Sequence, residues 1–137
     1  LEKAGVELIP HRATLLDPHT VEVDGRKVTA DKILIAVGGE AVKPNIPGME
    51  YTLTSREMFL LKEQPKRLAV LGAGYIAVEF AGIMQGLGTQ VTQLIRGDLF
   101  LRGFDEDVRI GIFDGMKHRG INIVGNMSLK GIEKTAE

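Results

Sequence analysis

The feature that most constrains this chain is a glycine-rich turn between an apolar strand and an amphipathic helix. Residues 68–71 have the pattern of a short buried strand, and the run Gly72-x-Gly74-x-x-Ala77 follows directly. From Ile76 to Leu87 the apolar residues recur at helical spacing, and residues 90–95 form a second strand pattern. This order of strand, turn, helix and strand predicts a βαβ unit of a parallel sheet.

The residue types in the turn suit the pyrophosphate of a dinucleotide. Gly72 permits a tight turn, Gly74 lets the backbone approach the phosphates, and the small Ala77 lets the helix pack closely on the strand. The unpaired amides and the dipole of the helix N-terminus then hold the anion. The alternative is a glycine-rich turn that binds no ligand, and the position between strand and helix disfavours it.

The end of the second strand indicates which dinucleotide to expect. A site for NAD places an acidic residue there, about 20 residues after the glycines, to bind the ribose 2′-hydroxyl. Here the strand ends at Arg96, 22 residues after Gly74, and Arg102 follows six residues later. A guanidinium binds a 2′-phosphate bidentately. We therefore expect NADPH rather than NADH, with solvated charge as the alternative for both arginines.

The composition excludes several classes of protein. Apolar residues make up 44% and charged residues 26% of 137, as in an ordinary globular domain rather than a disordered, collagen-like or coiled-coil chain. The net charge of −1 disfavours binding of nucleic acid. No apolar run approaches the roughly 20 residues of a membrane span. The absence of cysteine excludes disulfides, thiolate metal sites and thiol chemistry within this sequence.

The first third has the pattern of a β-meander that leads into a buried strand. Asp24-Gly25 has the signature of a two-residue hairpin turn. Ile33–Val37 is apolar throughout, which predicts a strand buried on both faces that ends at Gly38-Gly39. The remaining predicted strands are residues 6–9, 12–16, 20–23 and 26–29.

The rest of the chain completes an α/β pattern. Residues 40–53 form a predicted linker, and Thr54 and Glu57 form a predicted capping box that begins a short helix to about Leu61. Asp105 is the predicted N-cap of a helix to about Arg119, with a third strand over residues 121–124. The predicted fold class is α/β: a Rossmann-like βαβ nucleotide-binding unit preceded by a β-meander.

Residues 32–107 resemble the pyridine nucleotide–disulfide oxidoreductases, most closely the glutathione reductases of plant and cyanobacterial type. The resemblance lies in the segments 33–39, 46–48, 72–82, 95–98 and 101–105. The pair Arg96 and Arg102 and the run Arg102-Gly103-Phe104-Asp105 make it specific. Dihydrolipoamide dehydrogenases are expected to carry an acid at position 96. Trypanothione reductases share the Arg-Gly-Phe-Asp run and remain an alternative.

The resemblance implies an NADPH domain inserted into an FAD domain, with hydride passing from NADPH to FAD and electrons then passing to a disulfide and glutathione disulfide. It implies FAD-domain residues at 1–48, a linker and short helix at 49–66, and an NADPH domain, with later strands of its sheet missing, at 67–137. The implied cofactor-binding positions are Gly72, Ala73, Gly74, Tyr75, Ile76, Glu79, Arg96, Arg102, Arg12, Val37 and Gly38.

Four of these positions have specific implied roles. Tyr75 is similar to an aromatic gate over the nicotinamide pocket, although a tyrosine packed at a helix start is an equal alternative. Glu79 is similar to a carboxylate near the nicotinamide, with a solvated glutamate as the alternative. Arg12 and Val37 match positions whose backbone approaches FAD, and a purely structural role is the simpler alternative for both.

The departures from the family pattern limit what this sequence does by itself. It lacks the FAD fingerprint, the redox-active cysteine pair and the interfacial His–Glu pair, so we expect a central fragment with no catalytic residues of its own. A stand-alone NADP(H)-binding module is the alternative. The resemblance implies a homodimeric parent in the cytoplasm or a plastid, with no nucleic-acid or membrane partner. We expect no metal site, and His11, His19 and His118 have predicted structural or surface roles.

Overall fold

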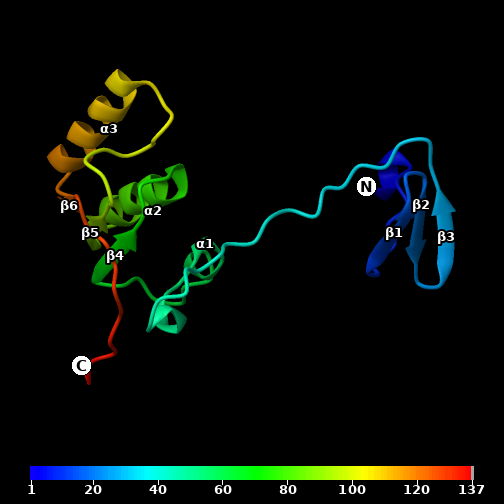
Figure 1. The fold of residues 1–137 in the computed structure, drawn as a ribbon, viewed down its shortest axis with the longest axis horizontal. Coiled ribbons are helices and arrows are strands. Elements are labelled where there is room, and N and C mark those ends of the chain that lie inside the picture. Colours follow the sequence, from blue (N-terminus) through cyan, green and yellow to red (C-terminus); the bar gives the residue numbers. More distant parts are fainter. Residues whose placement is uncertain (137) are drawn as a thin grey trace. The chain divides into compact units, whose positions relative to one another are not determined.

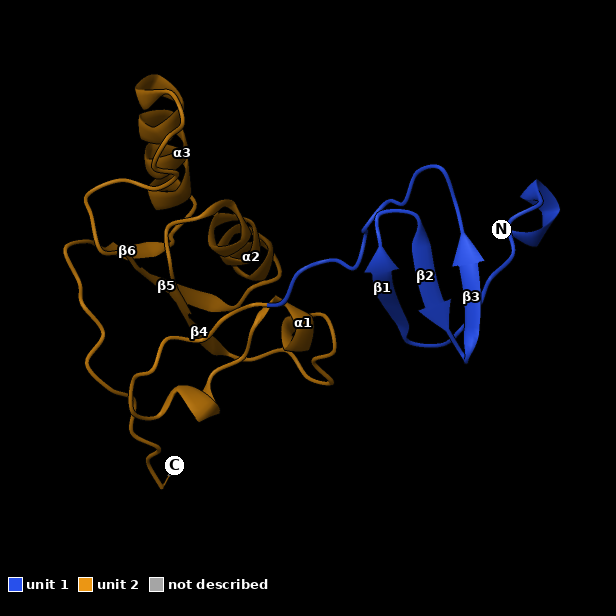
Figure 2. Ribbon diagram, turned by 45° about the vertical axis from the view of Figure 1, so that its right-hand side comes forward, with its two compact units in different colours: residues 1–40 blue, residues 41–137 orange. Residues whose placement is uncertain are grey.

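The chain forms two compact units, Leu1–Glu40 and Ala41–Glu137, in a computed structural model that describes residues 1–136 (Figure 2). The first unit contains a three-stranded antiparallel sheet, and the second contains a three-stranded parallel sheet with helices. The predicted α/β class, with a meander before a βαβ unit, is therefore confirmed.

The first unit is a meander whose tightest turn follows from its sequence. Asp24 and Gly25 both have positive φ, 51° and 71°, and the register pairs Val23 with Arg26 across them. Two consecutive left-handed residues give the turn whose twist matches that of the flanking strands, and Asp-Gly is a preferred pair for it. The elements are a 3-10 helix at Glu2–Ala4, then β1 (Ala13–Asp17), β2 (Thr20–Val23) and β3 (Arg26–Thr29) (Figure 1).

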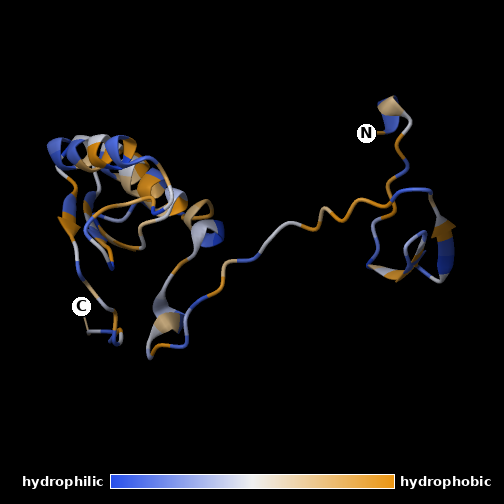
Figure 3. Ribbon diagram, turned by 45° about the horizontal axis from the view of Figure 1, so that its top comes forward, coloured by the Kyte–Doolittle hydropathy of each residue, from blue (hydrophilic) through white to orange (hydrophobic). Residues whose placement is uncertain are grey.

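Two predicted strands of the first unit do not form. Residues 6–9 and 33–37 have no strand partner in the described part of the chain. The prediction of a buried strand over Ile33–Val37 was wrong for this structure, since Leu34 is 88% and Val37 89% exposed. Figure 3 shows the hydrophobic colour of this extended segment. A strand buried on both faces needs neighbours in its sheet and a layer on each side. No strand of residues 1–136 lies beside this segment to supply them.

We expect the 137-residue chain by itself to be marginally stable. Its apolar segment stays exposed after folding, so these side chains add no buried surface to the free energy of folding. Thermal unfolding followed by circular dichroism should be broad at low protein concentration. A sharp cooperative transition in dilute, monomeric material would contradict this expectation.

The second unit is built on a parallel sheet whose strands end at one edge. The order is β4 (Arg67–Leu71), β5 (Gln90–Leu94), β6 (Asn122–Val124), and Leu94 pairs with Leu71 on one side and Val124 on the other. Helix α2 (Tyr75–Gly86) joins β4 to β5, and α3 (Glu106–His118) joins β5 to β6 (Figure 1). The carboxyl ends of parallel strands are where open α/β sheets bind ligands.

The core of this unit includes the loop between β5 and α3. Phe100, in that loop, is completely buried, and its ring lies 5.5 Å from that of Phe113 on α3. Leu101, the next residue, is also buried. The loop is therefore anchored in the core of the unit by these two side chains. The buried apolar cluster comprises Ala81, Met84, Val91, Ile95, Phe100, Leu101, Met116 and Ile121.

Residues 41–66 belong to the same compact unit as the parallel sheet. The amide of Ile132 donates to the carbonyl of Pro47 (2.9 Å), and Gln64 Nε2 donates to the carbonyl of Leu87 (2.7 Å). The segment contains a 3-10 helix at Met49–Tyr51 and helix α1 (Ser55–Met58), which ends earlier than expected. The assignment of residues 1–48 to an FAD domain and 67–137 to an NADPH domain stays a prediction. None of the helices in residues 1–136 has the length and apolar character of a membrane span.

The predicted capping box of α1 is confirmed. The Glu57 carboxylate accepts hydrogen bonds from the Thr54 hydroxyl (2.7 Å) and the Thr54 amide (2.6 Å). These bonds favour the ionised form and lower the pKa of Glu57, the hydroxyl having the larger effect. A lowered pKa in the folded state means that the stabilisation is present at neutral pH. It is lost as the pH falls through that pKa.

Substituting Thr54 by valine should raise the pKa of Glu57 towards its ordinary value, because the hydroxyl donor is removed. An NMR titration of the Glu57 carboxyl measures this directly. Thr52→Val is the control, since the Thr52 hydroxyl donates to the carbonyl of Met49 instead (2.7 Å). An unchanged Glu57 pKa in Thr54→Val would show that the capping box does not form in solution.

Candidate functional site

The glycine turn begins where β4 ends, and its geometry requires glycine. Gly72 has φ of +135°, which side-chain-bearing residues rarely adopt, and a Cβ there would lie 3.4 Å from the Cβ of Ala77. The Gly72 amide donates to the carbonyl of Leu94 (3.0 Å), so pairing with β5 continues past the last residue of β4. The first glycine and the small alanine of the motif therefore have the predicted packing roles.

The N-terminus of α2 is open, in contrast to that of α3. Gly74 is the N-cap of α2, no side chain caps it, and its first turn holds no acid. Asp105 caps α3 by accepting from the amides of Asp107 (3.0 Å) and Val108 (3.4 Å), as predicted. The first amides of α2 and its positive dipole end thus lack an internal counter-charge among the described residues. Such a helix end attracts an anion.

A segment with two arginines is attached directly to the glycine turn. We call residues 96–104, between β5 and α3, the arginine loop. The amide of Leu101 donates to the carbonyl of Ala73 (2.7 Å), and Leu101 has an unusual positive φ of 52°. Arg96 begins the loop, and Arg102 follows Leu101. Both arginines are exposed, and neither forms an ion pair within residues 1–136.

The only carboxylate of the arginine loop is already engaged. Asp98 is exposed, and its Oδ1 accepts a hydrogen bond from Asn126 Nδ2 (2.8 Å). It lies past the end of β5. The end of β5, near which an NAD site carries an acid, has Ile95 and Arg96 instead.

Gln93 is a component of the site that the sequence analysis did not identify. Its side chain is fully buried on β5, and its Nε2 donates to the carbonyl of Gly72 (2.9 Å). Its Oε1 is buried and has no partner among the described residues. The available signal was a polar residue between the apolar Val91 and Ile95, on the buried face of the strand.

The remaining predicted nucleotide positions lie on the first turns of α2. Tyr75 is 61% and Ile76 45% exposed, and Glu79 is exposed one helical turn after Tyr75. Solvent-facing side chains beside an open helix end are available to a ligand. The gating role of Tyr75 and the nicotinamide-directed role of Glu79 stay predictions.

The predicted FAD-contacting positions belong to the first unit and form no part of the site in the second. Arg12 directly precedes β1 and is exposed, and Val37 lies in the extended apolar segment. Gly38 follows with φ of +75°, and nothing lies within 4 Å of the position of a Cβ there. Their contacts to FAD stay predictions.

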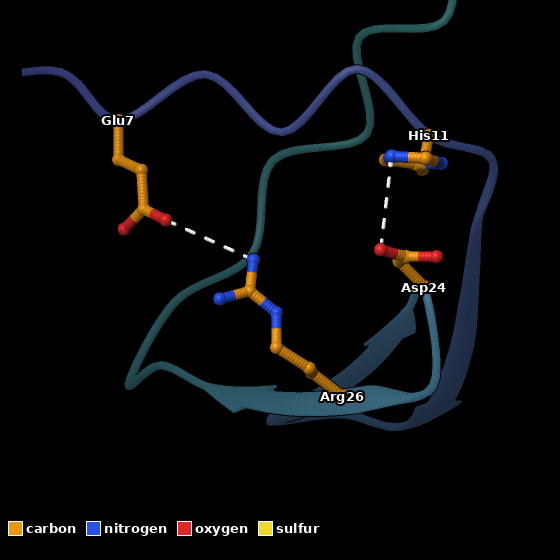
Figure 4. Close-up of polar contacts among 4 residues, drawn as sticks. All are labelled: Glu7, His11, Asp24 and Arg26. Carbon is orange, nitrogen blue, oxygen red and sulfur yellow. Dashed lines mark ion pairs between the residues drawn. The ribbon is translucent and has the colours of Figure 1, made fainter.

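The histidines have ordinary structural partners. In the first unit His11 lies 3.7 Å from Asp24, next to an exposed pair of Arg26 with Glu7 at 3.8 Å (Figure 4). Such exposed ion pairs contribute little to stability. His19 contacts the carbonyl of Ala30, and His118 that of Asp114. Within residues 1–136 no group of three possible metal ligands gathers.

A comparison of the sequence with models of known protein families identifies the family of this chain. Residues 1–137 match the model of the pyridine nucleotide-disulphide oxidoreductases over the whole chain. The chain belongs to this family. The resemblance inferred from the glycine turn and the arginine pair is thereby confirmed.

Three relatives show how much of a family member the chain represents. Glutathione reductase from Nostoc sp. is 62% identical over 137 residues, all of this chain and 30% of that enzyme. The HOCl-induced flavoprotein disulfide reductase RclA from Escherichia coli, in its Cu(II) complex, is 32% identical with a TM-score of 0.78, covering 93% of this chain and 31% of RclA. An engineered water-forming NADPH oxidase bound to NADPH is 26% identical with a TM-score of 0.69, covering 92% and 32%.

The chain thus spans about three-tenths of the length of these relatives. Its 62% identity over 137 residues to the Nostoc enzyme makes that enzyme a suitable host for testing it. In the experiments below, the host enzyme is a chimera in which this chain replaces the matching segment of the Nostoc sp. glutathione reductase.

Gly72→Ala should destabilise the host enzyme, because a residue with a Cβ in this conformation costs about 1–3 kcal/mol. Gly82→Ala is the matched control on α2, where nothing lies within 4 Å of the added Cβ. It should stabilise by about 0.5–1 kcal/mol, since alanine is the better helix former. The thermal midpoints of the two variants should therefore move in opposite directions. A shift of the same sign in both would contradict the turn geometry.

Proposed function

We propose that the second unit binds NADPH, with the pyrophosphate on the glycine turn and the 2′-phosphate at Arg96 and Arg102. One observation carries the proposal. The hydrogen bond from the Leu101 amide to the Ala73 carbonyl attaches the arginine loop to a turn that leads into an uncapped helix. The two parts of the chain that suit the two phosphate groups are therefore adjacent.

The pyrophosphate end fits the residues present. The first turn of α2 offers backbone amides with no competing cap and no acid, and the added Cβ of Gly74 would meet nothing within 4 Å. The backbone at Gly74 is thus open to close approach by a phosphate. In this arrangement the chain binds and orients the coenzyme through main-chain donors, which do not depend on pH.

The arginine pair supports the choice of NADPH over NADH. The engineered NADPH oxidase is a mutant of a water-forming NADH oxidase from Lactobacillus brevis. Its substitutions introduce two arginines six positions apart and replace an aspartate directly before the first. Arg96 and Arg102 have the same separation, 102 − 96 = 6, and the residue before Arg96 is the apolar Ile95. In a relative, the introduction of this arginine pattern in place of an acid thus accompanies the use of NADPH.

We further propose that the chain is the central segment of an NADPH-dependent glutathione-disulfide reductase that contains FAD. The 62% identity to the Nostoc sp. glutathione reductase supports this. FAD, when bound, accepts the hydride of NADPH and passes two electrons to a disulfide. The backbone at Arg12, Val37 and Gly38 would contact it. Because the chain has no cysteine, the redox-active disulfide and the site for glutathione disulfide come from other segments of a homodimeric parent.

A stand-alone binding module is the weaker alternative. The apolar segment with Leu34, Ile35 and Val37 is 69–89% exposed, so it needs partners that residues 1–136 do not supply. A segment of a larger flavoprotein has such partners, and an independent module does not. A trypanothione reductase stays the alternative parent enzyme, since the trypanothione reductases share the run Arg102-Gly103-Phe104-Asp105.

The double variant Arg96→Glu with Arg102→Leu tests the coenzyme assignment in the host enzyme. It removes two charge-assisted bonds to the 2′-phosphate and adds a repulsive carboxylate. We expect kcat/KM for NADPH to fall by about 30- to 1000-fold, or roughly 2–4 kcal/mol. For NADH, which has no 2′-phosphate, kcat/KM should hold or rise.

The matched control is Arg119→Leu, an exposed arginine that follows the other end of α3. It should leave both coenzymes unaffected. If the double variant lost equal activity with NADPH and NADH, the arginines would act through folding, and the assignment would be wrong.

A further inference from the structure

The peptide between Phe100 and Leu101 is held from both sides. Its N–H, on Leu101, donates to the carbonyl of Ala73 in the glycine turn (2.7 Å). Its C=O, on Phe100, accepts from Nε of Arg109 on α3 (2.7 Å). A peptide unit is planar, so fixing the direction of the carbonyl also fixes the direction of the amide. Arg109 therefore orients the hydrogen bond that joins the arginine loop to the turn.

Arg109 has no charged partner among the described residues that would explain its position otherwise. It is half-buried and forms no ion pair within residues 1–136. The carbonyl that it binds belongs to Phe100, whose ring is fully buried and anchored on Phe113. Leu101 then takes a positive φ, which costs energy for a leucine and requires support from its neighbours. Arg102 follows directly, so its position depends on this support.

Asn126 holds the other end of the arginine loop. Its amide donates to the carbonyl of Gly97 (3.2 Å), and its side chain donates to Asp98 (2.8 Å). The preceding residue, Gly125, lies so close that an added Cβ would come within 3.0 Å of the Gly97 oxygen. These contacts fix the residues directly after Arg96.

We propose that Arg109 and Asn126 are positioning residues for coenzyme selection: they hold the arginine loop so that Arg96 and Arg102 both meet the 2′-phosphate. The inference rests on the proposed function. It differs from a structural role in its prediction for the two coenzymes. Loss of the hydrogen bond from Arg109 or from Asn126 displaces the two arginines, whose phosphate partner only NADPH carries. Selectivity for NADPH then falls while activity with NADH holds.

The test for Arg109 uses a matched pair in the host enzyme. In Arg109→Gln, the Nε2 donor stands as many bonds from the backbone as Nε of arginine, without the charge. In Arg109→Met, the side chain has similar length and no donor. We expect Met to lower the NADPH/NADH ratio of kcat/KM by about three- to ten-fold, the effect of one hydrogen bond, through a higher KM for NADPH. Gln should restore most of the ratio.

The Asn126→Gly variant tests the hydrogen bond from the Asn126 side chain to Asp98. Glycine keeps the left-handed backbone of Asn126 (φ 55°) and removes only the side-chain donor to Asp98. We expect a fall in the NADPH/NADH ratio of the same order, with little change in the thermal midpoint. This variant keeps the test decisive where a change at the half-buried Arg109 prevents folding.

The outcomes separate the inference from the proposed function. A selectivity loss in Arg96→Glu with Arg102→Leu, but not in Arg109→Met or Asn126→Gly, would overturn the inference alone. If Arg109→Gln lowered the NADPH/NADH ratio of kcat/KM as much as Arg109→Met does, the charge would be what matters. Arg109 would then be a direct phosphate ligand rather than a positioning residue. Equal losses with NADPH and NADH would assign both residues a structural role and overturn the inference.

Discussion

The hydrogen bond between the Leu101 amide and the Ala73 carbonyl joins the two halves of the candidate site. Without it, the glycine turn is an open helix end, and the arginine loop is an exposed connection between a strand and a helix. With it, the main-chain donors proposed for one phosphate group are held next to the loop that carries the guanidinium groups proposed for the other. The bond is short, and the peptide that donates it is fixed through its carbonyl by Arg109.

The parallel sheet places this bond where it can form. Leu71, Leu94 and Val124 are paired neighbours at the carboxyl edge, so the glycine turn and the arginine loop leave adjacent strands side by side. The buried Gln93 adds a second link across the same edge, from β5 to the Gly72 carbonyl. A polar side chain buried in an apolar layer costs free energy unless it is bonded. Its presence here fits a strand that must hold the turn as well as fill the core.

Local patterns were enough to predict the parts whose causes are local. The hairpin at Asp24-Gly25, the capping box at Thr54 and the helix cap at Asp105 each depend on residues within a few positions of one another. The βαβ unit followed from periodicity and the glycine turn. The exposed state of residues 34–37 could not be predicted, because burial depends on partners that an apolar run does not identify.

The positioning residues were beyond the reach of sequence patterns for a different reason. Gln93, Arg109 and Asn126 all bond to backbone or side-chain groups that the fold alone brings near them. Nothing near Arg109 or Asn126 in the sequence distinguishes them from solvated polar residues, and Gln93 is marked only by its place between the apolar Val91 and Ile95. The two predicted phosphate-binding arginines were recognisable because their distance from the glycine turn is set by the length of one helix and one strand.

The most direct measurement is a crystal structure of the host enzyme with NADPH. It should show the pyrophosphate at the amides that begin α2 and the 2′-phosphate within hydrogen-bond distance of both Arg96 and Arg102. The Leu101 amide should still donate to the Ala73 carbonyl. A 2′-phosphate held by other residues, with either arginine turned into solvent, would contradict the account.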